Sequence, residues 1–417
     1  MSTPESIDAL RAQGYSYTDI GEQLGLSKDA ARGRHARWLA ERNRHPLAPD
    51  APAVPAPSEG DGEGRLSFSA AVRDAGPAGD GDSEGDVAAR LRATNKSLLR
   101  QLGVLRASRE EYVEAVYRAV NDAASSIVIP APRQPKADPR EATEEVAVAV
   151  LSDWQLGKRT PSYDSAVCAE RIDRFADKVI SLTAIQRKDH PVRELRVHIL
   201  GDIVEGEQIF PGQAHLIDSS LFEQTTESGP TILISFLTRM LAHFDRVHVV
   251  AVIGNHGRIG RKGDFNPQTN GDRMVYRNTQ RILDGRPGFE RLTWDIPSIP
   301  NERAWYAISR IGNYSALLIH GDQFRGTAGI PWYGLQKKAG GWALGAIDES
   351  FDDVDFGHFH QPTRVTLNNV TARCSGSPES HNDFAAEQLA AVGRPSQGLR
   401  FVHPDKGIVT AEYVCWL

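Results

Sequence analysis

The feature that most constrains the fold is a set of short apolar runs that each end in metal-ligating side chains. Residues 195–200 (LRVHIL) are predicted to form a buried strand, because β-branched and apolar residues dominate the run, and Gly201 and Asp202 follow it at once. A carboxylate is costly to bury without a partner, and ligands of α/β sheets gather at the carboxyl ends of strands. Asp202 is therefore either a helix-capping residue or a functional carboxylate.

Four further predicted strands repeat this pattern, at 146–151, 247–253, 314–319 and 354–357. One strand that ends in an aspartate is common and means little. Five strand ends that supply carboxylates, amides and imidazoles together predict a metal site assembled from the whole sheet. The side chains concerned are Asp153, Gln155, Asp202, Asn255, His256, His320, His358 and His360.

The order and spacing of these residues resemble the calcineurin-like metallophosphoesterases. The motifs are DWQ at 153–155, GD at 201–202, GNH at 254–256, His320, and GHFH at 357–360. The family pattern is DxH, GD, GNH, H and GHxH. The DNA-repair nucleases look like the nearest branch, because GNHG here lacks the longer signature of the Ser/Thr phosphatases. The implied fold class is α/β, as a four-layer α-β-β-α sandwich of two sheets, with a small all-α domain before it.

The resemblance also implies a pair of divalent metal ions. The implied ligands are Asp153, Gln155 and His360 for the first ion, Asn255, His320 and His358 for the second, and Asp202 as the bridge between them. His256 would bind no metal and would stabilise the transition state or protonate the leaving oxygen. Mixed nitrogen and oxygen ligands favour Mn²⁺, with Fe, Zn²⁺ or Mg²⁺ as the other candidates.

Gln155 departs from the family pattern, which has histidine at this position. A glutamine oxygen still binds a hard cation, but it is a weaker donor than imidazole toward Zn²⁺ or Fe. We therefore expect the first ion to be loosely held and the protein to prefer Mn²⁺ or Mg²⁺.

Several residues near these motifs are candidates for contact with a substrate. Glu205, Gln213 and His215 lie in the loop after the Asp202 strand, and Arg258 lies in the Gly-rich basic loop GNHGRIGRKGD. A guanidinium group there would hold a phosphate, although a solvated loop explains Arg258 equally well. Asp322 follows His320 by two residues and is predicted to orient its imidazole.

Residues 1–45 form a separate unit that resembles helix-turn-helix modules, in the phrase YTDIGEQLGLSKDAARGRHARW. Its third predicted helix is basic and suits contact with DNA phosphates and base edges. A helical protein-docking domain with a solvated basic face is the competing interpretation. The predicted DNA-binding residues are Lys28, Arg32, Arg34 and Arg37.

The rest of the chain divides by composition. Residues 46–85 are rich in Pro, Gly, Ala and acidic side chains and are predicted to be a disordered linker. Residues 86–129 are predicted as a long helix or helix pair, in which a heptad repeat over 86–127 indicates either a coiled-coil homodimer or a helix packed on the next domain. A second linker, 130–143, precedes the predicted catalytic domain, 144–417.

Composition narrows the remaining choices. The net charge of −6 gives no global attraction to nucleic acid, so DNA binding would need local patches. No apolar run reaches the roughly 20 residues of a membrane helix, and the three cysteines are too scattered to suggest a disulfide framework. Because no signal pattern begins the sequence, we expect a cytoplasmic protein without membrane contact.

Together these features predict a metal-dependent phosphoesterase, namely a phosphodiesterase or nuclease that acts on DNA by two-metal-activated hydroxide attack. Two alternatives stay open. One is a phosphatase or a phosphodiesterase of small molecules or cyclic nucleotides. The other is a non-enzymatic DNA-binding protein that retains a vestigial phosphoesterase fold.

Overall fold

The computed structural model divides the chain into two units, Met1–Thr94 and Asn95–Leu417. The residues it describes are 7, 17–27, 30, 34, 96, 100, 129–210, 212–260, 265–297, 305–324, 331–379 and 393–417. Among them, no helix is both long and apolar enough to cross a membrane.

The first unit is described around helix α2 (Tyr17–Leu24), where Ile7 and Ile20 are buried together. Of the four residues predicted to bind DNA, Arg34 is helical and exposed. Lys28, Arg32 and Arg37 lie outside the described residues, as do the predicted linker 46–85 and nearly all of the predicted helix 86–129.

The second unit is built on two β-sheets. The six-stranded sheet contains, in spatial order, β11 (Ile408–Trp416), β10 (Ser396–His403), β1 (Val146–Leu151), β2 (Glu194–Ile199), β3 (Arg246–Ala251) and β4 (Leu292–Asp295). The five-stranded sheet contains β5 (Tyr306–Ile311), β6 (Tyr314–Ile319), β7 (Asp353–Phe356), β9 (Val370–Cys374) and β8 (Thr363–Leu367).

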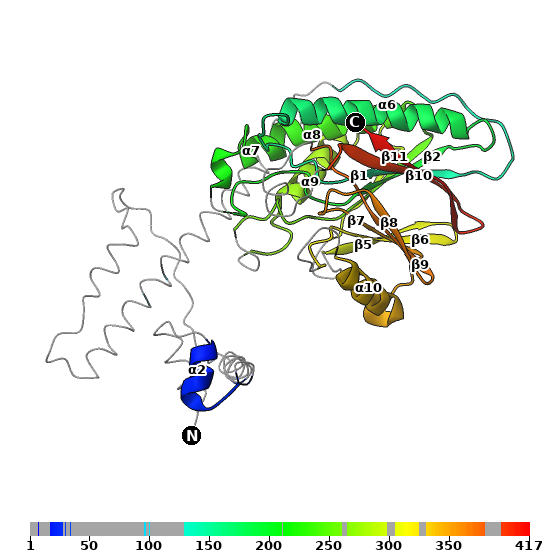
Figure 1. Cartoon of the computed structure of the whole chain (residues 1–417). Helices are drawn as coiled ribbons and strands as arrows, with labels where there is room; N and C mark the ends of the chain where they lie inside the picture. Colours follow the sequence, from blue (N-terminus) through cyan, green and yellow to red (C-terminus); the bar gives the residue numbers. More distant parts are fainter. Residues whose placement is uncertain are drawn as a thin grey trace, which may run out of the picture. The chain divides into compact units, whose positions relative to one another are not determined.

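Helices lie outside both sheets. The six-stranded sheet is covered by α6 (Ser165–Gln186), α8 (Gly229–Leu241) and α9 (Gly271–Leu283), and the five-stranded sheet by α10 (Trp332–Gly341) (Figure 1). Short turns of helix complete the described elements: η1 (Gln213–His215), α7 (Leu221–Glu223), η2 (Gln224–Ser228) and η3 (Trp342–Ala346). The predicted fold class, a four-layer α-β-β-α sandwich, is confirmed for this unit.

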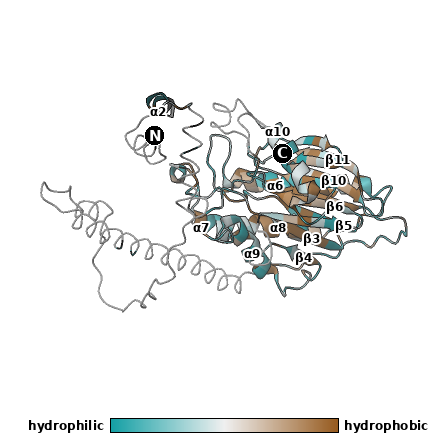
Figure 2. Cartoon of the chain, turned by 90° about the horizontal axis from the view of Figure 1, so that it is seen from below, coloured by the Kyte–Doolittle hydropathy of each residue, from teal (hydrophilic) through white to brown (hydrophobic). Residues whose placement is uncertain are grey.

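Alternation along the strands produces the layers. In β1, Ala147, Ala149 and Leu151 pack toward the helices, while Val148 and Val150 pack between the two sheets. Successive strand side chains point to opposite faces, so an entirely apolar strand must be covered on both sides. Figure 2 shows this distribution, with hydrophobic colour concentrated on the strands and mixed colour on the helices.

Strand register brings the predicted motifs to a common edge. β1, β2 and β3 are parallel neighbours, and Ile199 pairs with Leu151 on one side and with Ala251 on the other. β6 and β7 are also parallel, with Leu318 opposite Asp355. The loops after these strands therefore leave each sheet at the same end, which is where ligands bind in open α/β sheets.

Two strands of the six-stranded sheet were not predicted from the sequence, namely β4 and the interior strand β10. The β10 sequence SQGLRFVH interrupts its apolar positions with glutamine, glycine and Arg400, which is only 2% exposed. Its guanidinium donates to Asp355 Oδ2 at 2.6 Å. A buried ion pair thus replaces the apolar side chain that the strand pattern would require.

His198 completes this polar cluster between the sheets, where it bonds to protein side chains on both of its ring nitrogens. Its Nδ1 lies 2.7 Å from Asp355 Oδ2, and its Nε2 lies 2.9 Å from Ser309 Oγ. Burial lowers the pKa of His198, an effect that hydrogen bonding to Asp355 opposes only in part. The neutral imidazole donates to Asp355 and accepts from Ser309.

Residues 130–143, predicted as a linker, contain no helix or strand. They are nevertheless held against the domain. Arg193 Nη2 donates to the Asp138 carbonyl at 2.8 Å, and Arg140 Nη2 donates to the Arg187 carbonyl at 2.7 Å.

Replacing His198 by leucine tests the inter-sheet cluster. The pKa of His198 is lower in the folded protein than in the unfolded chain. As pH falls through about 6.5, the unfolded chain therefore binds a proton that the folded protein does not bind, and the free energy of unfolding decreases. His198→Leu should cost about 1–3 kcal/mol at neutral pH and flatten the decline between about pH 7 and pH 5. Urea unfolding across that range measures both effects.

Ser309→Ala is the matched control, because it removes the hydrogen bond to Nε2 and leaves the imidazole in place. It should lower stability while keeping most of the pH dependence, because burial, the main cause of the lowered pKa of His198, remains. Parallel stability curves for wild type and His198→Leu would contradict this account.

Candidate metal centre

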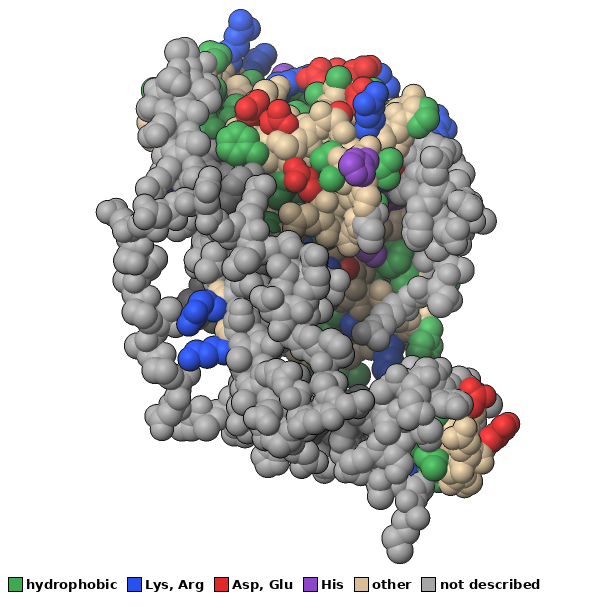
Figure 3. All heavy atoms as spheres, turned by 90° about the vertical axis from the view of Figure 1, so that its left-hand side faces the viewer, with side chains coloured by type: hydrophobic (Ala, Val, Ile, Leu, Met, Phe, Trp, Pro, Cys, Tyr) green, Lys and Arg blue, Asp and Glu red, His purple; other side chains and the backbone are tan. Residues whose placement is uncertain are grey.

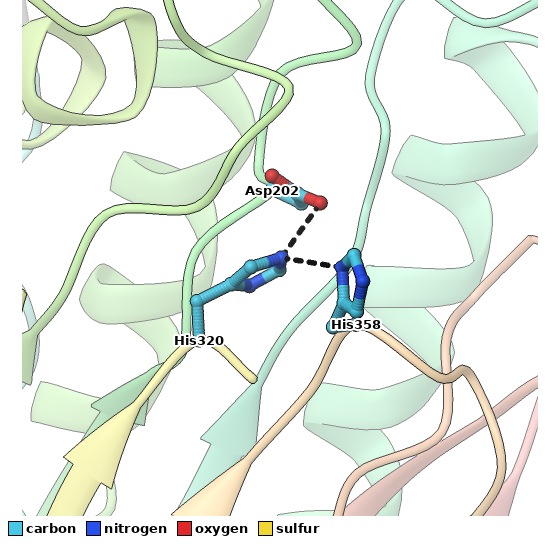
Figure 4. Close-up of side chains that lie close together, drawn as sticks. All are labelled: Asp202, His320 and His358. Atoms are coloured by element: carbon cyan, nitrogen blue, oxygen red, sulfur yellow. Dashed lines mark hydrogen bonds and ion pairs between the residues drawn. The ribbon is translucent and has the colours of Figure 1, made fainter. Parts of the chain in front are cut away.

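Four of the predicted ligands converge between the two sheets. His320 Nε2 lies 2.9 Å from Asp202 Oδ2, 3.1 Å from Asn255 Oδ1 and 3.2 Å from His358 Nδ1. One ligand atom from each of Asp202, His320 and His358 lies within 4.8 Å of the others. Figure 4 shows these three side chains pointing toward one another from the ends of β2, β6 and β7. We refer to Asp202, Asn255, His320 and His358 as the inner set.

The other three predicted ligands, Asp153, Gln155 and His360, lie beside the inner set. His360 Nε2 is 3.4 Å from Asp153 Oδ1 and 3.4 Å from the Gln155 amide nitrogen. The Asp153 carboxylate also accepts from the His358 backbone N–H, at 2.9 and 3.1 Å, which joins the two groups. We refer to Asp153, Gln155 and His360 as the outer set. The structure thus brings all seven residues into one region.

The backbone at this centre is strained. Six described non-glycine residues have positive φ, and all but Asn368 belong to the predicted ligands, namely Asp153, Gln155, Asp202, His358 and His360. Positive φ is unfavourable for residues with a side chain, and such conformations cluster at functional sites because the surrounding structure must enforce them. The strain is therefore independent support for a functional site here.

Two glycines are required by close approach. A Cβ on Gly254 would lie 2.1 Å from Asp202 Oδ1, and a Cβ on Gly357 would lie 2.2 Å from Asp153 Oδ2. Both distances are far below van der Waals contact. The glycines of the GNH and GHFH motifs thus make room for the carboxylates that the neighbouring strands supply.

Asp272, in the first turn of α9, organises the loops and was missed in the sequence. Its carboxylate accepts four backbone N–H groups, from Asp202, Ile203, Val204 and Gly254, at 2.8–3.1 Å. The sequence signal was weak, because an aspartate at the start of a helix is normally a capping or dipole-compensating residue. Here it fixes the strand-end loops that carry Asp202 and Asn255.

His256 lies next to the inner set. Its backbone N–H donates to Asp202 Oδ1 at 2.7 Å, and its Nδ1 lies 3.1 Å from Glu205 Oε2. Burial lowers the pKa of His256, but the charges of Asp202 and Glu205 outweigh burial and raise the pKa to about 9. The Nε2 atom faces the Gln155 amide at 3.4 Å, toward the outer set.

Glu205 and Gln213, considered as substrate contacts, are instead supports of His256. Glu205 is 2% exposed, and the Gln213 amide donates to its Oε1 at 3.0 Å and to its carbonyl at 2.8 Å. Buried side chains with these partners do not face a substrate. His215, the third candidate in this loop, is exposed on η1.

The imidazole of His320 is oriented by a backbone carbonyl, because its Nδ1 lies 2.8 Å from the Leu200 oxygen. Asp322, which was predicted to orient this ring, adds a negative charge near it. The Asp322 carboxylate accepts a hydrogen bond from Arg258 Nη2 at 2.5 Å. Arg258, predicted as a phosphate contact, is therefore held at the rim of the centre by an ion pair that partly neutralises it.

The inner set suits a divalent cation. Burial lowers the pKa of His320, but the Asp202 carboxylate outweighs it and raises the pKa to about 10. Burial and the charge of His320 together lower the pKa of His358 to about 4. The buried carboxylate of Asp202 thus stabilises a positive charge next to it. A metal ion held by carboxylate, amide and imidazole donors would supply that charge.

No protein-family model matches the chain, and no curated protein matches it. Among solved structures, a predicted phosphoesterase from Streptococcus pneumoniae is 15% identical, covers 66% of this chain and 99% of its own, and gives a TM-score of 0.27. An archaeal phosphodiesterase is 12% identical over 64% and 99%, with a TM-score of 0.30. Vps29 from Entamoeba histolytica, complexed with Zn²⁺, is 14% identical over 64% and 98%, with a TM-score of 0.29.

Likeness at such TM-scores carries no conclusion about activity. The function of this chain is therefore inferred from the site itself.

Replacing Asp272 by asparagine tests the loop-organising carboxylate. The amide has one acceptor oxygen, and its NH₂ group would face backbone N–H donors that lose their partner. We expect a loss of about 1–3 kcal/mol in unfolding free energy and, by analogy with residues that orient metal ligands, a 10–100-fold loss of Mn²⁺ affinity. Urea unfolding and calorimetric Mn²⁺ titration measure the two effects.

Asp284→Asn is the control, since Asp284 is exposed at the other end of α9. It should match wild type in both measurements. Wild-type Mn²⁺ affinity in Asp272→Asn would show that the loops hold their shape without this carboxylate.

Proposed function

We propose that the protein is a metal-dependent phosphodiesterase that acts on DNA. The observation that carries this proposal is the inner set, a buried carboxylate, amide and two imidazoles in contact, with His256 hydrogen-bonded to the same Asp202 carboxylate. A divalent cation bound there would act as a Lewis acid on the phosphoryl group.

His256 is suited to proton transfer to the leaving oxygen. Glu205 contacts its Nδ1 and holds the ring, while Nε2 remains directed toward the region between the inner and outer sets. A histidine whose far nitrogen is held by a buried carboxylate keeps one orientation, which positions its other nitrogen for a general acid. Backbone donation to Asp202 fixes His256 relative to the ligands.

A cavity of about 180 Å³ beside the centre supports a substrate larger than phosphate. It is lined in part by Gly254, Arg258 and Asp322, which flank the ligand motifs, and by the aromatic residues Phe265 and Trp305. Aromatic faces stack on nucleobases, and a guanidinium group pairs with phosphate. We infer that the part of a diester next to the scissile phosphate would contact this lining.

The choice of DNA over other diesters rests on the N-terminal unit, whose sequence resembles helix-turn-helix modules. Figure 3 shows basic and acidic side chains interspersed on the described part of one face. The basic side chains predicted on the third helix of this unit, Lys28, Arg32, Arg34 and Arg37, would supply a local attraction for DNA phosphates.

The alternative enzyme is a phosphatase or a phosphodiesterase of cyclic or small nucleotides, which the same centre would serve. A non-enzymatic protein is disfavoured by the positive φ values, because strain at five of the seven predicted ligand positions has a cost that packing alone does not require.

A substrate panel tests the function. With Mn²⁺, wild type should hydrolyse DNA and an aryl phosphodiester, and His256→Ala should lose about 10²–10⁴-fold in turnover on a DNA phosphodiester. His190→Ala, a partly exposed histidine outside the centre, should retain activity. The proposal fails if no phosphodiester is cleaved with Mn²⁺, Mg²⁺, Zn²⁺ or Fe²⁺.

A second variant tests DNA as the target. Replacing Lys28, Arg32, Arg34 and Arg37 together by alanine should weaken hydrolysis of DNA and its salt dependence, while hydrolysis of the aryl diester stays unchanged. Equal effects on both substrates, or none on either, would favour a small-molecule phosphodiesterase.

A further inference from the structure

We propose that the centre binds one divalent cation, in the inner set, and that the ammonium group of Lys158 takes the place of a second cation beside the outer set. The inference rests on the proposed function only in that the centre binds metal. It departs from the two ions that the sequence motifs imply.

Lys158 reaches the outer set from the turn after β1. Its Nζ donates to Gln155 Oε1 at 2.9 Å and lies 2.6 Å from Glu379 Oε1. The lysine side chain is 14% exposed and the Glu379 side chain 2%. An ammonium so placed is a buried, paired charge and not a solvated surface group.

The contact with Lys158 fixes the orientation of the Gln155 amide. An ammonium group is a donor only, so the amide oxygen must face it, and the NH₂ group must then face His256 and His360. The oxygen is the atom through which glutamine would bind a metal. Here it is bound to a cation already, and a metal on the same oxygen would lie close to a second positive charge.

His360 is engaged in a similar way. Its Nδ1 lies 3.2 Å from Glu379 Oε2 and its Nε2 lies 3.4 Å from Asp153 Oδ1. Both ring nitrogens therefore face carboxylates.

The inner set differs from the outer set in its contacts with basic side chains. Within the described part of the chain, no lysine or arginine donates to Asp202, Asn255, His320 or His358. The inner set thus has room for an added positive charge, while the outer set already contains one.

This arrangement gives a physical reason for glutamine at position 155. A carboxamide can accept from Lys158 through oxygen and donate toward a histidine through nitrogen at the same time. An imidazole at this position would have to point a ring nitrogen at the ammonium group. Gln155, Lys158 and Glu379 therefore form one unit.

Metal stoichiometry tests the proposal without any substrate. The full-length protein, freed of metal by a chelator and dialysed against Mn²⁺, should bind one ion per chain by elemental analysis. Its bound Mn²⁺ should give the electron paramagnetic resonance spectrum of an isolated ion. Two ions per wild-type chain with a spin-coupled spectrum would overturn the proposal, whatever any variant does.

Lys158→Ala and Lys158→Gln should both gain a second bound ion at raised Mn²⁺, because each removes the ammonium group. Lys188→Ala, at an exposed lysine, should remain at one ion. His358→Ala should lose the single ion. If both Lys158 variants fold, as circular dichroism shows, and still bind one ion, then Lys158 does not exclude the second.

These results separate the two proposals. A protein that binds one ion and cleaves no phosphodiester would refute the proposed function and leave the single-ion centre intact. A phosphodiesterase that binds two ions would support the proposed function and refute the single-ion centre.

Discussion

The carboxylate of Asp272 accepts hydrogen bonds from two strand-end loops at once, and the geometry of the centre depends on it. Peptide N–H groups that leave a sheet lose their ladder partners and need new ones when they are buried. One side chain on α9 satisfies four of them, three from the Asp202 loop and one from Gly254. Asn270, the N-cap of α9, ties the helix start to the same place by donating to the Gly254 carbonyl at 3.2 Å.

This framework explains how the strained conformations persist. A residue at positive φ costs roughly 1–3 kcal/mol, and five such residues surround the centre. Charge-assisted hydrogen bonds oppose the cost: Asp153 accepts from the His358 backbone and Asp202 from the His256 backbone. Each carboxylate therefore holds a neighbouring loop in addition to offering oxygen atoms to a cation.

The sequence predicted the two-sheet fold and the regions that meet, because periodicity and strand-end polarity are local signals. It did not predict the supports. Asp272 and Glu379 look like ordinary acidic residues in sequence, Glu205 was considered only as a substrate contact, and Lys158 lies more than two hundred residues from Glu379 along the chain. Their roles depend on burial and on partners that only tertiary packing supplies. Strand β10 was missed for the same reason, since Arg400 is tolerable in a buried strand only opposite Asp355.

The cluster of His198, Asp355 and Arg400 fixes the position of one sheet relative to the other at the centre. Aliphatic side chains between two sheets attract one another with little directional preference, so they resist separation better than sliding. Asp202 and Asn255 follow strands of one sheet, and His320 and His358 follow strands of the other. Directional hydrogen bonds from β2 and β10 to β7 cross between the two sheets and resist their sliding. They therefore keep the two halves of the coordination shell in alignment.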